Sequence, residues 1–374
     1  MKYKLSDLFE LQMGKTPSRD NTEYWSQPEY PWVSIADLSG AGKYIYATKE
    51  SISRLAIEES GIKTIPANTV IMSFKLSIGK VSITPIPMYS NEAIMAFIDK
   101  GITTIKPEYL YYLLLHRDWD EGTNKAVMGK TLNKATLSDV VIDVHSIEDQ
   151  DRIVAVLDKV SDIIERYQKQ LNTLDILVKA RFVDLFGDDI KRSALTIGDI
   201  AEETTVGIAN SATHAYSESG VVMLRNQNIR VNYLDDSDLI YIKQEFAEKY
   251  RNKALQKGDI LVTRTGANVG MACIVPKKYE GCQTFTTLIL RLRKDLHVSP
   301  TFVCHYINSP IGKTFVDKNK IGGGQPNFGA KQLATMPIIL PSDEKQMEFD
   351  LLVEHVDKSK LIVLHLFTFS AGLH

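Results

Sequence analysis

Ser146-Ile147-Glu148-Asp149-Gln150 begins a stretch that ends at Phe186-Gly187 and around which the rest of the chain is arranged. Within the stretch, apolar residues recur at alternating spacings of four and three, which is a heptad pattern. Such a pattern predicts a helix with a narrow apolar seam that packs against one partner helix. Ser146 followed by acidic residues is typical of a helix start, and Gly187 of a helix end. We therefore expect a spacer helix within 146–187, of roughly 38 residues and about 57 Å. The seam residues recur at alternating spacings of four and three, at Ile153, Leu157, Val160, Ile164, Tyr167, Leu171, Leu174 and Val178.

The segments on either side of this predicted helix resemble each other. Five pairs of short motifs occur in the same order and at a nearly constant offset, which indicates an internal duplication. The duplicated arrangement is a globular domain followed by a helix, and it supplies the partner helix within the same chain. The pairs are 5–8 with 197–200, 66–72 with 256–262, 79–83 with 270–274, 105–110 with 298–303, and 147–150 with 343–346.

Each globular half mixes short β-type segments with few helices, which predicts an α+β domain. Pro107 and Pro300 stand at the expected first positions of helices. We predict two similar domains at 1–145 and 188–341, the central helix at 146–187 and a distal helix at 342–374. The predicted strands are 30–35, 69–74, 80–84, 93–98 and 140–144 in the first half, and 221–224, 259–263, 272–275, 286–292 and 336–340 in the second.

The distal helix departs from the central one near its end. It starts in the same way, with Val353 and Val356 at seam positions, but the match fails after Lys360. From there to His374 the chain has no Lys, Arg, Asp or Glu, and its apolar residues leave the heptad. One interpretation is a buried apolar terminus. We favour another, that the C-terminal part of this helix is missing or replaced, which leaves the outer half of the central helix unpaired.

Composition bounds the possible functions. A net charge of −2 gives no general polycation mechanism for nucleic-acid binding, so such binding needs local patches. Three cysteines without a CxxC pair favour a reducing, cytoplasmic setting. No apolar run has the length of a membrane span. We expect no signal peptide, because Met1 to Lys4 lead directly into an amphipathic segment.

Signatures of catalysis are missing from the sequence. The Gly-Lys-Thr triplets at 14–16, 129–131 and 312–314 lack the earlier glycine of a phosphate loop. Neither HExxH, nor a Cys/His cluster, nor a GxSxG elbow occurs. The base-clamping motif of adenine methyltransferases and the carboxylate-lysine motif of metal-dependent nucleases also fail to match. We expect neither catalytic residues nor a metal site in this chain.

Binding candidates fall in polar, glycine-containing segments. The residue types at 225–230 contact base edges in DNA, although a polar strand edge and turn explains them equally. The loops at 263–270 and 73–79 follow strands and carry Arg or Lys, although a tight hairpin also accounts for their glycines. The matching segments 128–133 and 322–327 suit phosphate or groove contacts or, alternatively, form surface turns. The basic loop at 14–19 completes the set. The candidate DNA-contacting residues are Lys15, Arg19, Lys75, Ser77, Lys130, Thr131, Asn133, Arg225, Asn226, Asn228, Arg230, Arg264, Thr265, Asn268, Gln325 and Asn327.

The duplicated arrangement resembles the specificity subunit of type I restriction-modification systems. The resemblance rests on Gly258-Asp259-Ile260-Leu261 before a glycine loop, on the Gly-rich segment 322–327, and on the helix starts 147–150 and 341–346. It implies two target recognition domains that each bind one half of a split site in double-stranded DNA. It also implies that the helices pair as an antiparallel coiled coil with internal pseudo-two-fold symmetry. Ser146, where the family has proline, and the sequence after Lys360 depart from the pattern.

The resemblance also implies partners. Two methyltransferase subunits and a restriction/translocase subunit are expected to bind this chain, and S-adenosylmethionine, ATP and Mg²⁺ are expected on those subunits rather than here. Domains at the ends of such a helix would contact two positions on the DNA that are about one to one-and-a-half turns of the double helix apart. Two alternatives stay open: a non-catalytic coiled-coil adaptor that binds proteins, and a C-terminally altered specificity subunit that assembles poorly.

Overall fold

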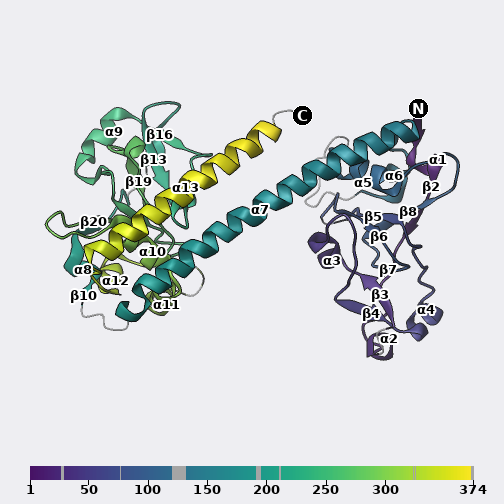
Figure 1. Ribbon diagram of the computed structural model, residues 1–374, viewed down its shortest axis with the longest axis horizontal. Coiled ribbons are helices and arrows are strands. Elements are labelled where there is room, and N and C mark those ends of the chain that lie inside the picture. Colours follow the sequence, from purple (N-terminus) through teal and green to yellow (C-terminus); the bar gives the residue numbers. More distant parts are fainter. Residues whose placement is uncertain are drawn as a thin grey trace. The chain divides into compact units, whose positions relative to one another are not determined.

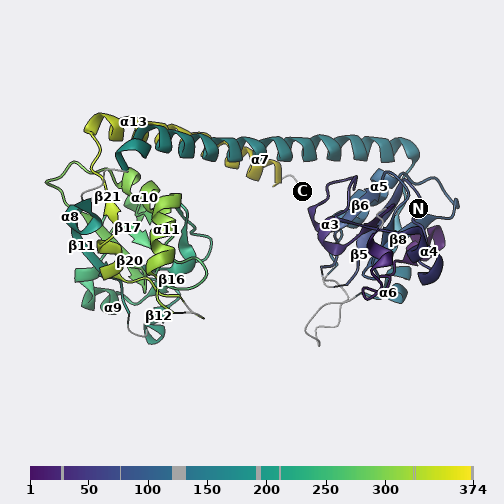
Figure 2. The same ribbon diagram turned by 90° about the horizontal axis from the view of Figure 1, so that it is seen from below.

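A computed structural model describes residues 1–26, 29–75, 77–119, 132–190, 195–209, 212–322, 324 and 326–371, with side chains described except at 190 and 363–371 (Figures 1 and 2). The chain divides into two compact units, Met1–Glu165 (unit 1) and Arg166–His374 (unit 2). Both units are α+β, as predicted.

Unit 1 is built on a four-stranded antiparallel sheet in the order β2-β8-β5-β6. All five residues of β5 are buried, because alternate side chains enter two different cores. Val70 and Met72 pack with helix α5, whereas Ile71 packs with residues from β3 and α3. The strands are Phe9–Met13 (β2), Ile94–Asp99 (β8), Thr69–Ser73 (β5) and Val81–Thr84 (β6).

A smaller sheet, β4-β3-β7, lies beside this core, with β4 antiparallel and β7 parallel to β3. A third pair, β1 with β9, is antiparallel. The remaining elements of unit 1 are β1 (Lys2–Lys4), α1 (Leu5–Leu8), α2 (Glu23–Ser26), β3 (Tyr30–Val33), α3 (Ile35–Gly40), β4 (Glu50–Ile52), α4 (Arg54–Ser60), β7 (Tyr89–Ser90), α5 (Pro107–Leu115), α6 (Lys134–Ser138) and β9 (Val141–Asp143).

Unit 2 repeats the three sheets of unit 1 and adds strand β12 to the second of them and a separate pair, β14 with β15. Its main sheet has the order β11-β20-β17-β18, and all its neighbouring strands are antiparallel, as in unit 1. In its second sheet, β13 pairs antiparallel with β16 and parallel with β19, as β3 does with β4 and β7. The pair β10 and β21 corresponds to β1 and β9. The predicted internal repeat is therefore present in the fold.

The five predicted strands of unit 2 correspond to β13, β17, β18, β20 and β21, whereas the other strands of this unit and helix α11 were not predicted. The elements are β10 (Leu195–Thr196), α8 (Ile197–Ile200), β11 (Ala201–Val206), β12 (Tyr216–Ser217), β13 (Val221–Arg225), β14 (Ile229–Arg230), β15 (Tyr233–Leu234), β16 (Ile240–Ile242), α9 (Gln244–Lys249), β17 (Ile260–Val262), β18 (Ala272–Ile274), β19 (Gln283–Phe285), β20 (Leu288–Leu292), α10 (Pro300–Asn308), α11 (Pro310–Asn319), α12 (Ala330–Ala334) and β21 (Pro337–Ile338).

Two long helices complete the structure, α7 (Ile147–Ile190) and α13 (Asp343–Ala371). Helix α7 continues through Gly187, so the expected stop there is wrong. Leu185 and Phe186 are buried in the unit 2 core, and this packing offsets a helical glycine's cost of about 1 kcal/mol. Helix α13 likewise continues beyond Lys360 and is not ended by the loss of the heptad.

Within unit 2, α7 and α13 pack antiparallel. Asp189, Arg181 and Asp175 of α7 form ion pairs with Lys345, Glu348 and Lys360 of α13, so one residue number falls as the other rises. Apolar contacts join the same faces, because Phe182 stacks edge-on against Phe349, with ring centroids 5.5 Å apart. Seam residues Val178 and Val356 are 5% and 4% exposed. The predicted antiparallel pairing is present here.

The first part of the seam behaves differently. Ile153 and Leu157 pack against the unit 1 core rather than against a helix. Val160 is partly buried, and Ile164 is 40% exposed. The expectation of one continuous seam facing one helix is therefore wrong for the part of α7 that belongs to unit 1. A neighbouring globular core can bury a heptad position as well as a second helix can.

One glutamine in each unit fixes the start of the long helix. The Gln150 side chain accepts a hydrogen bond from the Lys106 amide at 2.9 Å and donates to the carbonyls of Thr104 and His145 at 3.0 and 3.1 Å. Gln346 makes the same three bonds in unit 2, to Ser299, His297 and Pro341. Both side chains are almost wholly buried, at 0% and 4% exposed. This arrangement explains the paired motifs at 147–150 and 343–346.

Candidate nucleic-acid interface

The two glycine loops singled out in the sequence are the same hairpin. In unit 2, the Thr263 hydroxyl accepts from the Met271 amide at 2.9 Å and donates to the Asn268 carbonyl. In unit 1, the Ser73 hydroxyl accepts from the Lys80 amide at 3.0 Å and donates to the Ser77 carbonyl. Thr263 and Ser73 are fully buried. The hydroxyl thus holds the hairpin closed in both units.

A glycine ends each hairpin. Gly270 and Gly79 have φ angles of +86° and +84°, in the region that side chains disfavour. A Cβ atom on Gly270 would also lie 2.7 Å from Val316, and one on Gly79 would lie 2.9 Å from Trp119. The interpretation of these glycines as hairpin residues is correct. It leaves the side chains between the fixed ends available for binding.

In unit 2, three segments predicted separately meet at this hairpin. The Arg264 Nε donates to the Asn327 Oδ1 at 3.1 Å, and the Arg264 amide donates to the Asn226 Oδ1 at 3.4 Å. The Asn226 Nδ2 donates to the Thr265 hydroxyl at 3.1 Å. All four residues are partly exposed. We name Asn226, Arg264, Thr265 and Asn327 the arginine cluster.

The backbone beneath the arginine cluster is fixed on both sides. The Phe328 amide donates to the Arg264 carbonyl at 2.8 Å, and Thr265 and Asn327 form an antiparallel bridge. Phe328 is fully buried in the unit 2 core. Arg264 follows the buried strand β17, so its Cα position is set by core packing. Such rigid support favours a binding role, because little conformational entropy is lost when a ligand binds.

Three candidates at 225–230 are used by the fold instead. Asn228 is 2% exposed and donates to the carbonyls of Asp235 and Asp238 at 3.0 and 2.9 Å, so its assignment to DNA contact is wrong. Arg225 pairs with Asp238 and Arg230 with Asp235, both at 2.9 Å. These bonds hold the turn between β13 and β16. Only Asn226 of this segment belongs to the arginine cluster.

The unit 1 hairpin carries different side chains. The Leu132 amide donates to the Phe74 carbonyl at 3.1 Å, as Phe328 does to Arg264, so Phe74 takes the place of Arg264. Phe74 is 1% exposed. Lys75 therefore corresponds to Thr265, and its ammonium group lies 5.2 Å from the Phe74 ring centroid. Ser77 is exposed.

The remaining candidates in unit 1 are bound to their surroundings. The Arg19 guanidinium forms two bonds to Glu50, at 2.5 and 2.9 Å, and lies 3.8 Å from the Trp25 ring centroid. Lys15 donates to the Ser60 carbonyl. Asn133 caps α6 by accepting from the Thr136 amide at 2.8 Å. Glu50 neutralises Arg19, which makes Arg19 a weaker candidate for phosphate binding.

The structure leaves some candidates without a placement. Lys130, Thr131 and Gln325 lie outside the described residues. Asn268 is described and exposed at the hairpin of unit 2. Among the described residues, no group of three or more His, Cys, Asp or Glu could hold a metal ion. Within the same residues, no helix is long and apolar enough to cross a membrane.

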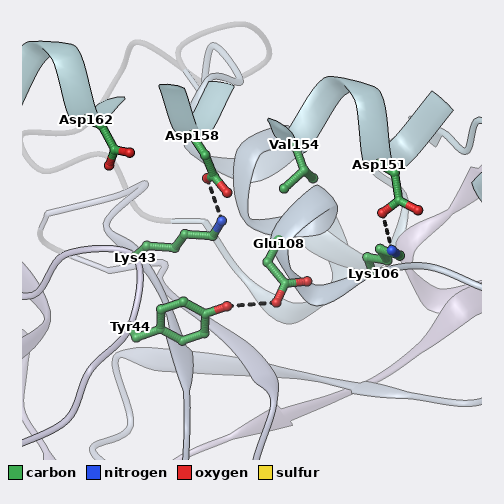
Figure 3. Close-up of a pocket in the computed structure, with 8 residues that line it drawn as sticks. All are labelled: Lys43, Tyr44, Lys106, Glu108, Asp151, Val154, Asp158 and Asp162. Atoms are coloured by element: carbon green, nitrogen blue, oxygen red, sulfur yellow. Dashed lines mark hydrogen bonds and ion pairs between the residues drawn. The ribbon is translucent and has the colours of Figure 1, made fainter. Parts of the chain in front are cut away.

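Within unit 1, a hollow of about 530 Å³ opens between the first turns of α7 and the residues around Lys43 and Lys106 (Figure 3). Lys43 pairs with Asp158 at 2.6 Å, Lys106 pairs with Asp151, and the Tyr44 hydroxyl donates to Glu108 at 2.7 Å. Four acidic residues and two lysines line it, so its net charge is −2, which disfavours phosphate. The eight lining residues are Lys43, Tyr44, Lys106, Glu108, Asp151, Val154, Asp158 and Asp162.

These ion pairs attach α7 to unit 1. Burial would raise the pKa of Asp158, but the hydrogen bonds from Lys43 and Tyr112 and the charge of Lys43 outweigh burial, so its pKa is lowered. Burial, together with the bond to Asp158, raises the pKa of Tyr112 to about 12. No local sequence pattern indicates this hollow, because the residues that line it lie far apart in the chain.

A family profile described as the type I restriction modification DNA specificity domain matches the chain over residues 1–175 and again over 194–360. The two matches cover most of the sequence and coincide with the two halves of the repeat. The chain therefore belongs to this family, the specificity subunits of type I restriction-modification systems. The second match ends at Lys360, where the heptad pattern fails.

Individual relatives agree. The chain is 31% identical over 322 residues to the type I restriction enzyme MjaIX specificity subunit of Methanocaldococcus jannaschii, covering 79% of this chain and 73% of that protein. It is 28% identical over 189 residues to the HindI specificity subunit of Haemophilus influenzae, covering 48% of this chain and 40% of that protein.

Two solved structures share the fold. One, described as the structural basis underlying complex assembly and conformational transition of the type I R-M system, has a TM-score of 0.56 and 15% identity, and the match covers 100% of this chain and 95% of that one. The crystal structure of the type I S subunit from M. genitalium has a TM-score of 0.52 and 13% identity, with 100% and 94% covered.

Proposed function

We propose that this chain is the non-catalytic DNA-recognition subunit of its restriction-modification complex, and that it binds a two-part site in double-stranded DNA. The observation that carries the proposal is the repeated hairpin. Both units have the same topology in their shared sheets and the same hairpin, which a buried hydroxyl closes and a glycine ends. We call this pair the hairpin frame. The residues after the hydroxyl differ: Arg264 and Thr265 in unit 2, Phe74 and Lys75 in unit 1. Equivalent scaffolds with different side chains are suited to two different half-sites.

We further propose that the long helices bind partner subunits, two methyltransferases and one restriction/translocase. Exposed apolar residues along α7 and α13 support this, because apolar residues gathered on one exposed face mark a protein-binding surface, and Ile176 and Val183, seven residues apart, lie on the same face of α7. Ile176, Val183 and Met347 are 65%, 63% and 63% exposed. On this proposal S-adenosylmethionine, ATP and Mg²⁺ belong to the partners, and the complex acts in the cytoplasm.

Footprinting tests the proposal. The chain should be mixed with its methyltransferase subunit and with target DNA, and the methyltransferase alone serves as the control. We expect two protected stretches separated by an accessible gap. Protection of one continuous stretch would contradict the two-part site, and no protection would favour the protein-binding adaptor. Methylation or cleavage by the purified chain alone would contradict the non-catalytic role.

Native mass measurement of the complex tests the partner number. Two methyltransferase subunits per chain would support the full arrangement and refute a defect caused by the sequence after Lys360. One subunit per chain would instead favour the C-terminally altered, poorly assembling form.

A further inference from the structure

The arginine cluster has unused hydrogen-bonding capacity. Arg264 commits its Nε to Asn327, and among the described residues neither of its two terminal nitrogens has a hydrogen-bond or ion-pair partner. An arginine whose Nε is held keeps two parallel N–H groups on the opposite edge of a fixed plane. Arg264 therefore presents a two-pronged donor, and the Asn327 bond sets its orientation.

This donor pattern selects one class of base edge. In the major groove, only guanine offers two adjacent acceptors, N7 and O6, in one plane. We infer that Arg264 recognises a guanine in the half-site bound by unit 2, and that Asn327 and Asn226 are positioning residues. This inference rests on the proposed function. It adds the identity of one base and confines it to one half of the site.

Asn226 is held in place by the cluster itself. Its oxygen accepts from the Arg264 amide and its nitrogen donates to the Thr265 hydroxyl. Through these two bonds Asn226 fixes the backbone of Arg264, whereas Asn327 fixes the guanidinium plane.

Unit 1 cannot make the same contact at the equivalent position. Phe74 replaces Arg264 there and is buried in the core. The guanine that Arg264 contacts therefore lies in the half-site bound by unit 2 and has no counterpart read from the equivalent position of unit 1. This asymmetry separates a base contact by Arg264 from a general electrostatic contribution, which would not depend on sequence.

Selection from randomised DNA tests the inference. Complexes of the chain with its methyltransferase subunit should select duplexes from a random library, with wild-type chain and with Arg264→Ala or Arg264→Gln. The wild type should select a split site with a fixed guanine in one half. Both variants should lose preference at that position alone and bind the selected site about 5- to 150-fold more weakly. If the alanine variant fails to fold, the glutamine variant still tests the inference, because it keeps the Cβ–Cγ–Cδ part of the side chain and a polar end.

The control is Arg251→Ala, which removes a charge from unit 2 at a side chain that is 81% exposed. It should leave base preference unchanged. If Arg264→Ala weakens all sequences equally and lowers the salt slope by about 1, Arg264 binds phosphate and the inference is overturned while the proposed function stands. If the wild-type complex selects no split site, the proposed function itself fails.

Substitutions at Asn327 test the positioning role. Asn327→Ala should weaken the guanine preference although Arg264 is intact. Asn327→Asp keeps an oxygen acceptor for the Arg264 Nε and should restore the preference, with lower overall affinity because of its negative charge. Equal preference in all three proteins would show that Asn327 does not orient the guanidinium.

Discussion

At the scale of single residues, the two buried glutamines offer a matched pair. Replacing Gln150 or Gln346 by alanine removes the partner of one amide and two carbonyls, in partly buried surroundings at Gln150 and largely buried ones at Gln346. We expect each change to lower the free energy of unfolding of its own unit by about 2–3 kcal/mol. The chain's three tryptophans, Trp25, Trp32 and Trp119, all belong to unit 1.

Urea unfolding followed by two signals should therefore separate the variants. Gln150→Ala should lower the urea midpoint of the transition followed by tryptophan fluorescence. Gln346→Ala should leave that midpoint unchanged and lower only the midpoint of the unit 2 transition, followed by circular dichroism. If Gln346→Ala shifts the fluorescence transition equally, the two units do not unfold independently and the assignment of each glutamine to one unit fails.

His305 of α10 predicts a pH dependence. Burial lowers its pKa to about 4, and the nearby Lys360 adds to this while Asp175 opposes it. The ring also packs edge-on against Phe349, with centroids 5.1 Å apart. In the unfolded chain the pKa is about 6.5, so the unfolded state takes up the proton first as pH falls. The contribution of neutral His305 to the free energy of unfolding of unit 2 is therefore fully present above pH about 6.5. It decreases below that pH, by up to about 1.4 kcal/mol per pH unit.

Urea unfolding between pH 7 and 5.5 measures this slope. His305→Gln has no group that titrates there, so its stability should be nearly constant over the same interval. An equal slope in both proteins would assign the pH dependence to other groups.

At the scale of elements, the seam of α7 can be tested at two nearby positions. Leu171 lies partly buried on the seam, whereas Ile176 is 65% exposed. Leu171→Asp should place a charge between α7 and α13 and weaken their pairing by about 1–3 kcal/mol. Ile176→Asp should leave the pairing intact.

Amide hydrogen exchange in α13 measures the difference. Leu171→Asp should speed exchange over the described part of α13 without affecting the strands of unit 2, and it should weaken assembly with the methyltransferase. Unchanged exchange and assembly would contradict a coiled-coil contact at Leu171.

Local sequence patterns predict some elements of this fold and not others. The pairing of α7 with α13 and several strands, among them β5, β17 and β20, were predicted, because the heptad and runs of apolar residues report directly on burial, whereas strands such as β2 and β11 were not predicted. The continuation of α7 through Gly187 was not predictable, because it depends on Phe186 entering a core formed by distant segments. The same holds for Arg19, whose partner Glu50 is 31 residues away.

The candidate site was predicted in part for similar reasons. Residue types indicated Asn226, Arg264 and Asn327 separately, and the fold brings them together. Asn228 was misassigned because the tight 3₁₀ turn Asn226–Asn228 directs neighbouring side chains to opposite sides. Residue types alone do not show whether Lys75 corresponds to Arg264 or to Thr265, because the unit 2 hairpin is one residue longer, and the hydrogen bonds to the Phe74 and Arg264 carbonyls establish that it corresponds to Thr265.

At the scale of the whole molecule, two duplicated units should act on separate parts of the DNA. Lys75→Ala in unit 1 and Arg264→Ala in unit 2 should each alter recognition in a different half-site. Selection from randomised duplexes with both variants checks this, and the double variant should show the sum of the two changes. Changes confined to the same half-site would contradict the division of labour between the units.

The hairpin frame has a consequence for how such a protein can acquire new targets. Closure depends on one buried hydroxyl and one glycine, and the two units enclose different side chains and different numbers of residues with the same frame. Substitutions between those two fixed points therefore need not disturb folding. Specificity can change in single steps, in one half of the target at a time, while the contacts that hold the domain and its partner helices stay as they are.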